Sequence, residues 1–427
     1  MYLALICLSL IALTTKAQIV NIPDANFKAA LISSGIDRNS DGQIQLSEAQ
    51  PVTELHIRNK SIADLTGIEA FINLYWLQCD SNQLTTLNFS QNTALFQLGC
   101  KNNQLTSLNV SQNTALFGLD CSCNILTSID VSKNTALASL YCSDNQITSI
   151  DVTNNTVLQQ LFCSSNPQLT SIVGVNNKSE FTYLICDLCQ LTSIDVGNNP
   201  AMTDLYCDNN QLSSINLTND ISLSTIQCPY NQLTSLDVST NTALGSLFCD
   251  LNQLSSIDVS HNAELWGLSL TENQITNLDI TNNTALTILW CTYNQLTSLD
   301  VSKNTALTDI ECALNSLTYL DVSNNTDLTK LYCYSNPNLS EICVNSTQLG
   351  LTTTDPTNWS KDNIAVWSTN CTTSINNNHD LNVQAPKLLH IFNLMGQEVN
   401  PEKVYEGIFI YQYNDGTVKK ISKLTQY

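Results

Sequence analysis

Charged residues are scarce in this chain, and basic residues are the scarcest. Only 12% of the 427 residues are charged, and 37 acidic residues outnumber 16 lysines and arginines, so the formal net charge is -21. Nucleic acids and anionic lipid surfaces are bound by clustered Lys and Arg side chains. We therefore expect a protein that does not bind nucleic acid.

Histidine and glycine are also rare, which argues against several kinds of catalytic site. The four histidines lie in separate regions, and none accompanies a candidate nucleophile in a recognisable motif. The 13 glycines form no phosphate-binding loop, and the zinc-protease motif HExxH is absent. A catalytic pair of carboxylates, as in glycosidases, stays an open alternative. The repeated Asp of the LDVS segments is, however, typical of a turn residue. The sequence predicts a protein that is not an enzyme.

Long apolar runs are missing after the first residues of the chain. Leu3–Leu13 is apolar but too short to cross a bilayer, and a small-residue cleavage site ending at Ala17 follows it. This pattern predicts a secretory signal peptide over residues 1–17, with a buried N-terminal strand as the alternative. No later run is long enough to span a membrane, so we expect an exported protein without a transmembrane segment.

A repeat of 21 residues dominates the rest of the chain. Cysteines stand at positions 79, 100, 121, 142 and 163, and after a two-residue slip at 186, 207, 228, 249, 291, 312 and 333, with Leu270 in the vacant position. The frame Leu-x-x-Leu-x-Cys-x-x-Asn-x-Leu predicts a strand with one buried face, and stacked copies predict a parallel sheet. We expect the Asn to turn the chain and to bond the backbone from rung to rung.

This frame resembles the leucine-rich-repeat signature, with Cys in the place of the third Leu, and segments such as NQLTSLDVS are similar to the internalin-like class of bacterial surface repeats. The resemblance covers residues 53–343. It implies a right-handed solenoid of about fourteen rungs with a parallel β-sheet, in a non-catalytic binding protein. Internalin-like repeats carry a longer turn where this chain reads VSxNTAL, which leaves open whether the second half of each unit is extended.

The repeat cysteines are expected to be free thiols. Parallel neighbours place their Cβ atoms roughly 4.8 Å apart, beyond the usual separation in a disulfide. A small buried thiol is the simpler interpretation, with disulfides as the alternative, and the Cys121-x-Cys123 and Cys186-x-x-Cys189 pairs lack partners for zinc. Outside the repeat, a disulfide between Cys343 and Cys371 is predicted to seal the core at a C-terminal cap over residues 344–372.

Residues 18–52 are predicted to form an N-terminal cap. A short helix is expected over residues 24–34, with Asp24 as its N-cap and with Phe27, Ala30 and Leu31 on one face. Residues 37–48 then fit the EF-hand frame D-x-N-x-D-G-x-I-x-x-x-E and resemble a single dockerin-like loop. The alternative is a polar turn. The frame predicts a structural Ca²⁺ ion held by Asp37, Asn39, Asp41, Gln43 and Glu48.

Residues 373–427 lack the repeat and are predicted to be a small β module. Strands are expected over 388–393, 407–413 and 417–422, with a hairpin turn at 414–416. The segments LMGQE at 394–398, GIFI at 407–410 and DGT at 415–417 resemble the C-terminal sorting domain of type IX secretion cargo, although a Pro-Asn-Pro opening is missing. The resemblance implies the type IX secretion machinery as a partner and attachment to the cell surface. A β-hairpin cap is the alternative.

The residue before each cysteine varies from rung to rung and is expected to lie on an exposed concave face, opposite the buried Leu and Cys. Many of these residues are aromatic, and exposed rings supply contacts to proteins and stack on sugars. The alternatives are rings that only stabilise the sheet, and a structural surface spacer. We expect an extracellular protein or polysaccharide to bind at Trp76, Tyr141, Phe162, Tyr206, Phe248, Trp290 and Tyr332.

Calcium is predicted to raise the melting temperature of the protein, because a ligand that binds only the folded state stabilises that state. The Asp41→Ala variant should lose this dependence, since it removes one carboxylate ligand. Scanning calorimetry in calcium and in a chelator measures both effects. A variant that still responds to calcium like the unaltered chain would contradict the assignment of this loop.

Overall fold

The structure, a computed structural model, describes residues 18–371, 388–393, 407–413 and 418–423. The chain divides into two compact units, Met1–Thr369 and Asn370–Tyr427. The expected signal peptide and the sorting-type segments at 394–398 and 415–417 lie outside the described residues. Within the described part of the chain, no helix is both long and apolar enough to cross a membrane.

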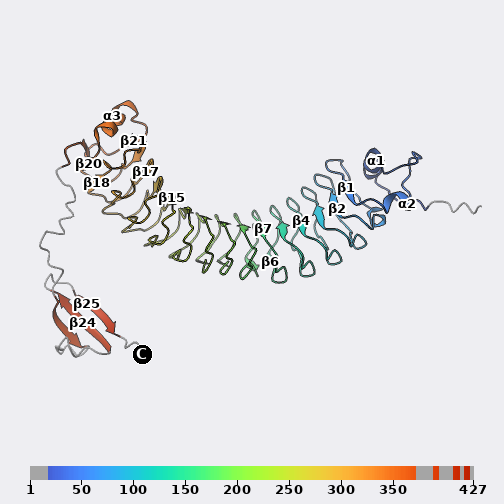
Figure 1. Cartoon of the computed structure of the whole chain (residues 1–427), viewed down its shortest axis with the longest axis horizontal. Coiled ribbons are helices and arrows are strands. Elements are labelled where there is room, and N and C mark those ends of the chain that lie inside the picture. The colour runs from blue at the N-terminus through green and yellow to red at the C-terminus, as the bar shows by residue number, and fades with distance from the viewer. Residues whose placement is uncertain (1–17, 372–387, 394–406, 414–417, 424–427) are drawn as a thin grey trace, which may run out of the picture. The chain divides into compact units, whose positions relative to one another are not determined.

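A parallel sheet of fifteen short strands runs along the first unit (Figure 1). Neighbouring strands are in register, so that Leu77 lies beside Leu98. The fifteenth strand, β21 (Trp359–Ser360), comes from the C-terminal cap. The other fourteen are the predicted rungs: β1 (Glu54–His56), β2 (Trp76–Gln78), β3 (Gln97–Gly99), β4 (Gly118–Asp120), β5 (Ser139–Tyr141), β7 (Gln160–Phe162), β9 (Tyr183–Ile185), β11 (Asp204–Tyr206), β13 (Thr225–Gln227), β14 (Ser246–Phe248), β15 (Gly267–Ser269), β16 (Ile288–Trp290), β17 (Asp309–Glu311) and β19 (Lys330–Tyr332).

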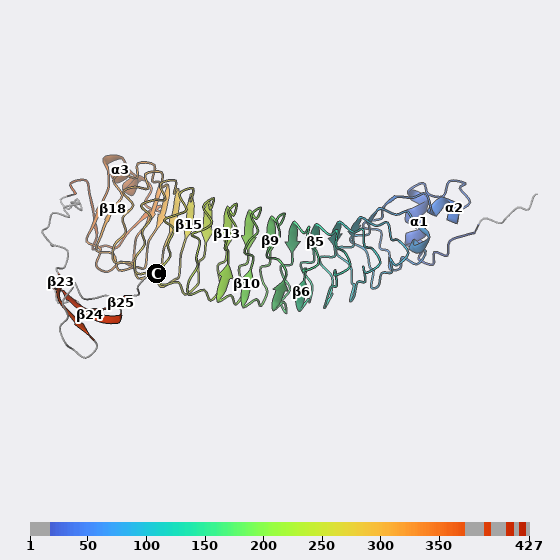
Figure 2. The ribbon, with the colours of Figure 1, turned by 60° about the horizontal axis from the view of Figure 1, so that its bottom comes forward.

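The second half of the rungs is extended only in places. Figure 2 shows β6 (Ser149–Asp151) and β10 (Ser193–Asp195) on the side opposite the long sheet. They pair with β8 (Ser171–Val173) and β12 (Ser214–Asn216), and β18 (Tyr319–Asp321), β20 (Glu341–Cys343) and β22 (Val366–Ser368) form a third small sheet. Many other rungs turn here instead, as the LDVS pattern predicts: Asp130 Oδ1 accepts the Ser132 N–H at 2.9 Å.

The core consists of Leu, Ile, Val and Cys side chains that stack from rung to rung, between the long sheet and the opposite side of the solenoid. In β7, for example, Leu161 and the following Cys163 are both fully buried. Each such leucine contributes about 1.5–3 kcal/mol on burial, but only when the next rung covers it. Fourteen cysteines of the described residues are free, whereas Cys343 and Cys371 are disulfide-bonded.

The predicted asparagine ladder closes the turn after most sheet strands. Asn103 Nδ2 donates to the carbonyl oxygens of Cys79 and Cys100 at 3.1 and 3.0 Å, and its Oδ1 accepts the Leu84 N–H at 3.1 Å. Cys189 occupies this position in one rung, with its Sγ 3.6 Å from the Cys163 carbonyl oxygen. The ladder thereby satisfies buried backbone groups that no strand neighbour reaches.

A second asparagine ladder, which the sequence analysis missed, lies within the NTAL segments on the opposite side. Asn134 is fully buried, and its Nδ2 donates to the carbonyl oxygens of Val110 and Asn113 at 3.0 and 2.8 Å. Lys178 replaces the asparagine in one rung and donates from Nζ to two carbonyl oxygens at 3.1 and 2.8 Å. The available signal was the Asn that recurs in nearly every unit.

Helices close the N-terminal end of the array. Before α1 (Ala25–Ser33), Asp24 Oδ1 accepts the N–H groups of Asn26 and Phe27, as predicted. The short helix α2 (Leu46–Ala49) follows the acidic loop, and a 3-10 turn η1 (Ile68–Ala70) precedes β2.

Residues 344–369 close the C-terminal end of the array. The helix α3 (Ser346–Thr354) begins at the cap residue Asn345. Gln348 donates from Nε2 to the Asn325 carbonyl oxygen at 2.8 Å, at the end of the second ladder. Trp359 is buried against the last rung.

The second unit contains an antiparallel sheet in the order β23 (Leu388–Asn393), β24 (Gly407–Tyr413) and β25 (Val418–Lys423). The first two strands have the predicted bounds, and the third is shifted by one residue from the expected 417–422.

The ladder thiols should be unreactive in the native protein, because burial raises their pKa, to about 12 at Cys121, Cys228 and Cys291. After unfolding without a reductant, the fourteen free cysteines should react with a thiol reagent, and Cys343 and Cys371 only after reduction. A yield far below fourteen would show that the ladder is oxidised.

Asp220 occupies a ladder position that asparagine fills in the neighbouring rung. Its Oδ1 accepts the Asn199 N–H at 2.7 Å, but its buried Oδ2 has no hydrogen-bond partner. The corresponding Nδ2 of Asn199 donates to the carbonyl oxygens of Val175 and Val196. An ionised carboxylate cannot donate such bonds, and burial raises the pKa of Asp220 to about 7.

The Asp220→Asn substitution should therefore stabilise the protein at neutral pH. The folded-state pKa lies above the ordinary value of 3.8, so the unaltered chain loses stability as the pH rises from about 4 to about 7. We expect the variant to gain roughly 1–3 kcal/mol at about pH 8 and little at about pH 4. Urea unfolding measures both values, with exposed Asp237→Asn as control. No gain at the higher pH would contradict this account.

Candidate ligand-binding face

The predicted aromatic residues lie on the side of the long sheet that faces away from the core. Alternation buries the middle residue of each strand and turns the first and third away from the core, as the burial pattern of β7 shows. Trp76 begins β2 and is 37% exposed. The remaining six end their strands and are half-buried: Tyr141, Phe162, Tyr206, Phe248, Trp290 and Tyr332.

These rings form separate groups along the face. The Tyr141 and Phe162 rings lie on adjacent strands with centroids 4.7 Å apart. Phe248 and Trp290 stack at 6.3 Å across β15, whose face residues Gly267 and Ser269 are small. Between the two groups, Ile185 and Gln227 take the ring position. The structure therefore brings together pairs of predicted residues but no continuous row of seven.

Three further rings stack immediately before the strands, and the sequence analysis did not identify them. Tyr75, Phe96 and Phe117 follow one another with centroid distances of 4.8 and 4.9 Å and nearly parallel planes. Their spacing of 21 residues was the available signal, because in-register rungs align every residue that recurs at the repeat period.

A hollow of about 290 Å³ lies at the N-terminal end of the face. Trp76 and Tyr141 line it, together with the ion pair between Arg58 Nε and Asp80 Oδ2 at 2.6 Å. Gly99 leaves the space open, because a Cβ atom there would lie 2.8 Å from Asp80 Oδ1. The lining combines aromatic, charged and amide groups, which suits recognition of a polar ligand.

Acidic side chains accompany the rings in the middle of the face. The Asp208 N–H donates to Asp187 Oδ1 at 3.2 Å, and burial together with the neighbouring Asp208 carboxyl raises the pKa of Asp187 to about 7. Burial also raises the pKa of Asp250. A hydrogen bond to Asp204 raises the pKa of Tyr183 on the adjacent strand. These carboxyl groups share a surface without a cation among them.

One lysine lies on the C-terminal part of the face. Lys330 Nζ contacts Asp309 Oδ2 at 3.1 Å and forms a second ion pair with Glu311. The same Nζ lies 4.8 Å from the Tyr332 ring centroid and 5.8 Å from that of Trp290. Both distances fall within the range of cation–π attraction, so this part of the face already holds a cation between acids and rings.

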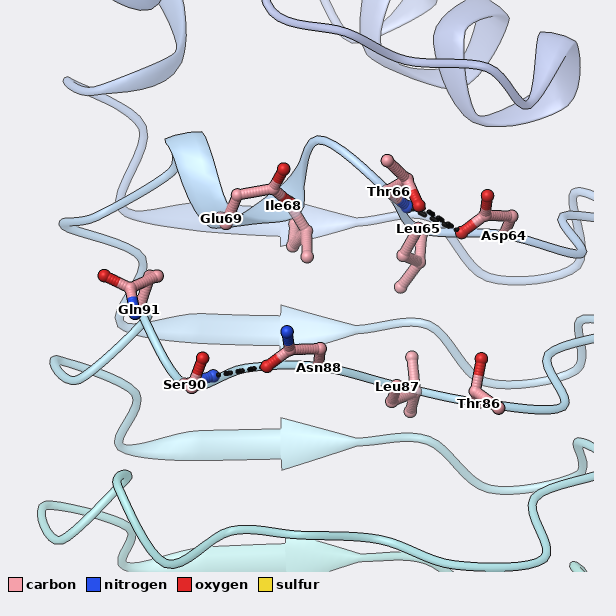
Figure 3. Close-up of a pocket in the computed structure, with 10 residues that line it drawn as sticks. All are labelled: Asp64, Leu65, Thr66, Ile68, Glu69, Thr86, Leu87, Asn88, Ser90 and Gln91. Carbon is pink, nitrogen blue, oxygen red and sulfur yellow. Dashed lines mark hydrogen bonds between the residues drawn. The ribbon is translucent and has the colours of Figure 1, made fainter.

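A larger hollow, of about 400 Å³, lies on the opposite side of the first two rungs. Figure 3 shows its lining, where Asp64 accepts hydrogen bonds from Thr66 and Asn88 accepts one from Ser90. Similar hollows recur around Asp130 and Asp279 in later repeats. Because the hollow recurs with the repeat, it is a property of the solenoid and not a distinct site.

The predicted calcium loop is closed by its own hydrogen bonds. Gly42 has a φ of 77°, and Asp37 Oδ2 accepts its N–H at 2.9 Å. Glu48 accepts the N–H groups of Arg38 and Gln45 at 2.9 and 3.0 Å, one with each carboxylate oxygen. Among the described residues, no three His, Cys, Asp or Glu side chains are grouped to hold a metal. The oxygen donors suit Ca²⁺ by type, and several of them are engaged here in hydrogen bonds within the loop.

Solved structures of leucine-rich-repeat proteins resemble this chain. The functional domain of internalin J from Listeria monocytogenes, described as including a cysteine ladder, has a TM-score of 0.65 at 29% identity and covers 96% of this chain and 99% of that domain. An internalin, InlF, from the same species has a TM-score of 0.57 at 20% identity, over 77% and 98%. A leucine-rich-repeat protein of Leptospira interrogans has a TM-score of 0.56 at 19% identity, over 76% and 97%.

The sequence likeness to a curated relative is shorter. Internalin J of Listeria monocytogenes serotype 4b is 39% identical over 71 residues, which are 17% of this chain and 8% of that protein. No protein-family model matches the chain. The structural likenesses establish the leucine-rich-repeat solenoid, of the kind found in internalins.

Proposed function

We propose that this chain is a non-catalytic binding protein, secreted or attached to the cell surface, that recognises an extracellular protein or polysaccharide. The observation that carries the proposal is the placement of aromatic side chains on the solvent side of the long sheet. Trp76, at 37% exposure, and the hollow beside it illustrate this placement. Large rings are costly in water unless a partner covers them, and they are favoured contact residues at interfaces.

Export and attachment belong to the same proposal. The apolar segment over residues 1–17 would direct secretion, and the module over residues 373–427 would be the address read by the type IX secretion machinery. The antiparallel pairing of β24 with β25 supports a separate β module there, and GIFI at 407–410 forms part of β24.

A structural calcium ion at the N-terminal cap is also proposed, on the strength of the EF-hand frame. The ligands would be the predicted five, of which Glu48 would exchange its backbone partners for the ion. Ile44, the apolar residue within the loop, is buried in the core. Calcium bound by the loop would therefore stabilise the N-terminal cap.

A structural spacer without a specific ligand is the second candidate. The observation that favours it is the contact between rings of neighbouring rungs, such as Tyr141 with Phe162 at 4.7 Å. Cross-strand aromatic pairs stabilise a sheet by roughly 0.2–1 kcal/mol each, so these rings have a use even without a partner.

A variant with Phe162, Tyr206, Phe248 and Trp290 changed to Ala separates the two candidates. If the face binds, the variant should lose affinity by about tenfold or more while keeping its circular dichroism spectrum, because truncated anchor residues weaken binding strongly. Surface plasmon resonance against cell-surface polysaccharides and matrix proteins measures the affinity. The matched control changes Phe96 and Phe117, which stack outside the face, to Ala.

If neither the unaltered chain nor the variant binds, and the variant is markedly less stable, the rings are structural and the spacer is correct. If the four-residue variant still binds but the Phe96 and Phe117 control does not, the binding site lies at the edge of the sheet and not on the face.

A further inference from the structure

The turn after the sheet strands places one residue per rung in the left-handed backbone region. Thirteen such residues, from Ser81 to Ser335, have φ between 51° and 57°. The hydrogen-bond ladder imposes this conformation: the Tyr230 N–H donates to the Asp250 carbonyl oxygen at 3.0 Å, and the Tyr293 N–H to that of Ala313 at 2.9 Å. Among residues other than Gly, this region favours Asn and Asp.

The composition of this column changes halfway along the array. The first five positions, from Ser81 to Ser165, hold Ser, Asn, Cys, Asp and Ser, but the later positions hold five Leu or Tyr residues. Four of these five are exposed, by 40% to 58%. Stability explains neither the backbone strain nor the exposure of a large apolar side chain. We call these residues the turn ridge: Leu188, Tyr230, Leu251, Tyr293 and Leu314.

The sheet face beside the turn ridge carries charge of one sign. Nine strands that are neighbours in the long sheet, from β5 to β17, each lie within a stretch of seven residues. Each stretch begins one residue before the strand and ends at the residue with the left-handed backbone. These stretches contain no Lys, Arg or His. A surface of this kind attracts a cationic partner and repels an anionic one. The carboxylates in the stretches are Asp144, Asp187, Asp204, Asp208, Asp250, Glu272, Asp309 and Glu311.

Lys330 shows how a basic side chain is held at the border of this surface. Its ammonium group lies between two carboxylates of β17 and within 6 Å of two rings. Another acid–aromatic group, with Asp204, Tyr183 and Tyr206, has no basic residue in its rungs. A partner's Lys or Arg would supply there the contacts that Lys330 supplies in its own rung.

We propose that the turn ridge and the acidic face beside it form one docking surface for a polypeptide segment that carries basic and apolar side chains together. This inference rests on the proposed binding function and narrows its ligand to a protein. The partner's apolar side chains would cover Leu188, Leu251 and Leu314, which the hydroxyl-rich surface of a polysaccharide does not match. Its basic side chains would meet the carboxylates.

The test uses the full-length chain and fluorescein-labelled peptides of repeated Lys-Leu-Ser, Glu-Leu-Ser and Lys-Ser-Ser. Fluorescence anisotropy should show binding of the Lys-Leu-Ser peptide, weakened by added salt. The other two peptides should bind at least about tenfold more weakly, since each lacks one of the two complementary features. Equal binding of the Glu-Leu-Ser peptide, or no binding of the Lys-Leu-Ser peptide, overturns the proposal.

A ridge variant with Tyr230, Tyr293 and Leu314 changed to Asn separates binding from folding. Asn tolerates the left-handed conformation, so the melting temperature should stay or rise while peptide affinity falls about tenfold or more. The matched control changes Ser81 and Ser165 to Asn, in the same turn outside the turn ridge, and should keep its affinity. Unchanged affinity in the ridge variant overturns the proposal.

Failure of this inference is distinguishable from failure of the proposed function. If a polysaccharide or matrix protein binds through Phe162, Tyr206, Phe248 and Trp290 while the Lys-Leu-Ser peptide does not, only the docking surface is wrong. If no peptide, polysaccharide or matrix protein binds, both proposals are overturned.

Discussion

Buried asparagine amides hold the rungs of this protein in register, and the rest of the structure depends on that contact. Each rung turns twice, and each turn leaves backbone carbonyl groups buried where no strand neighbour reaches them. Asn103 on one side and Asn134 on the other donate from a single Nδ2 to carbonyl oxygens of their own rung or the one before it. An unpaired buried carbonyl costs about 1–3 kcal/mol. The leucine core becomes continuous because both of its edges are satisfied in this way.

The exceptions in the ladders show what the position requires. Lys178 reaches two carbonyl oxygens with its ammonium group, and the Cys189 thiol, a weak donor, lies 3.6 Å from the Cys163 carbonyl oxygen and 3.3 Å from that of Asp187. Asp220 alone among these three lacks a donor when ionised, and burial raises the pKa of its carboxyl. All three lie in the rungs around the two-residue slip of the repeat, where the turn geometry differs and Asn177, Asn198 and Asn219 enter the left-handed region.

Because the contacts that stabilise the solenoid lie in its interior, the residues on its outer face can vary from rung to rung. The inward Leu and Cys hardly change between rungs, whereas the outward positions range from Gly99 to Trp290 without altering the strand register. The left-handed turn position is constrained in its backbone and unconstrained in its side chain. Leu and Tyr there, like the run of carboxylates without a base, are therefore features of the surface and not of the fold. This separation of scaffold from surface is what a recognition protein needs, because the surface can change without refolding the core.

The sequence by itself determined the period, the number of rungs, the inward residues and the first asparagine ladder, because in-register stacking converts recurrence at 21 residues directly into spatial neighbours. It also located the N-terminal helix through Asp24 and the strands of the second unit through their apolar runs. Only the tertiary structure decided which aromatic rings touch, since small residues such as Gly267 let Phe248 stack on Trp290 across an intervening strand. It likewise decided that Glu48 accepts backbone hydrogen bonds and that Tyr230 and Leu314 adopt a left-handed backbone. Which rings touch depends on the size of the side chains in the neighbouring rungs. The left-handed backbone depends on hydrogen bonds between rungs, which the sequence of a single repeat unit does not contain.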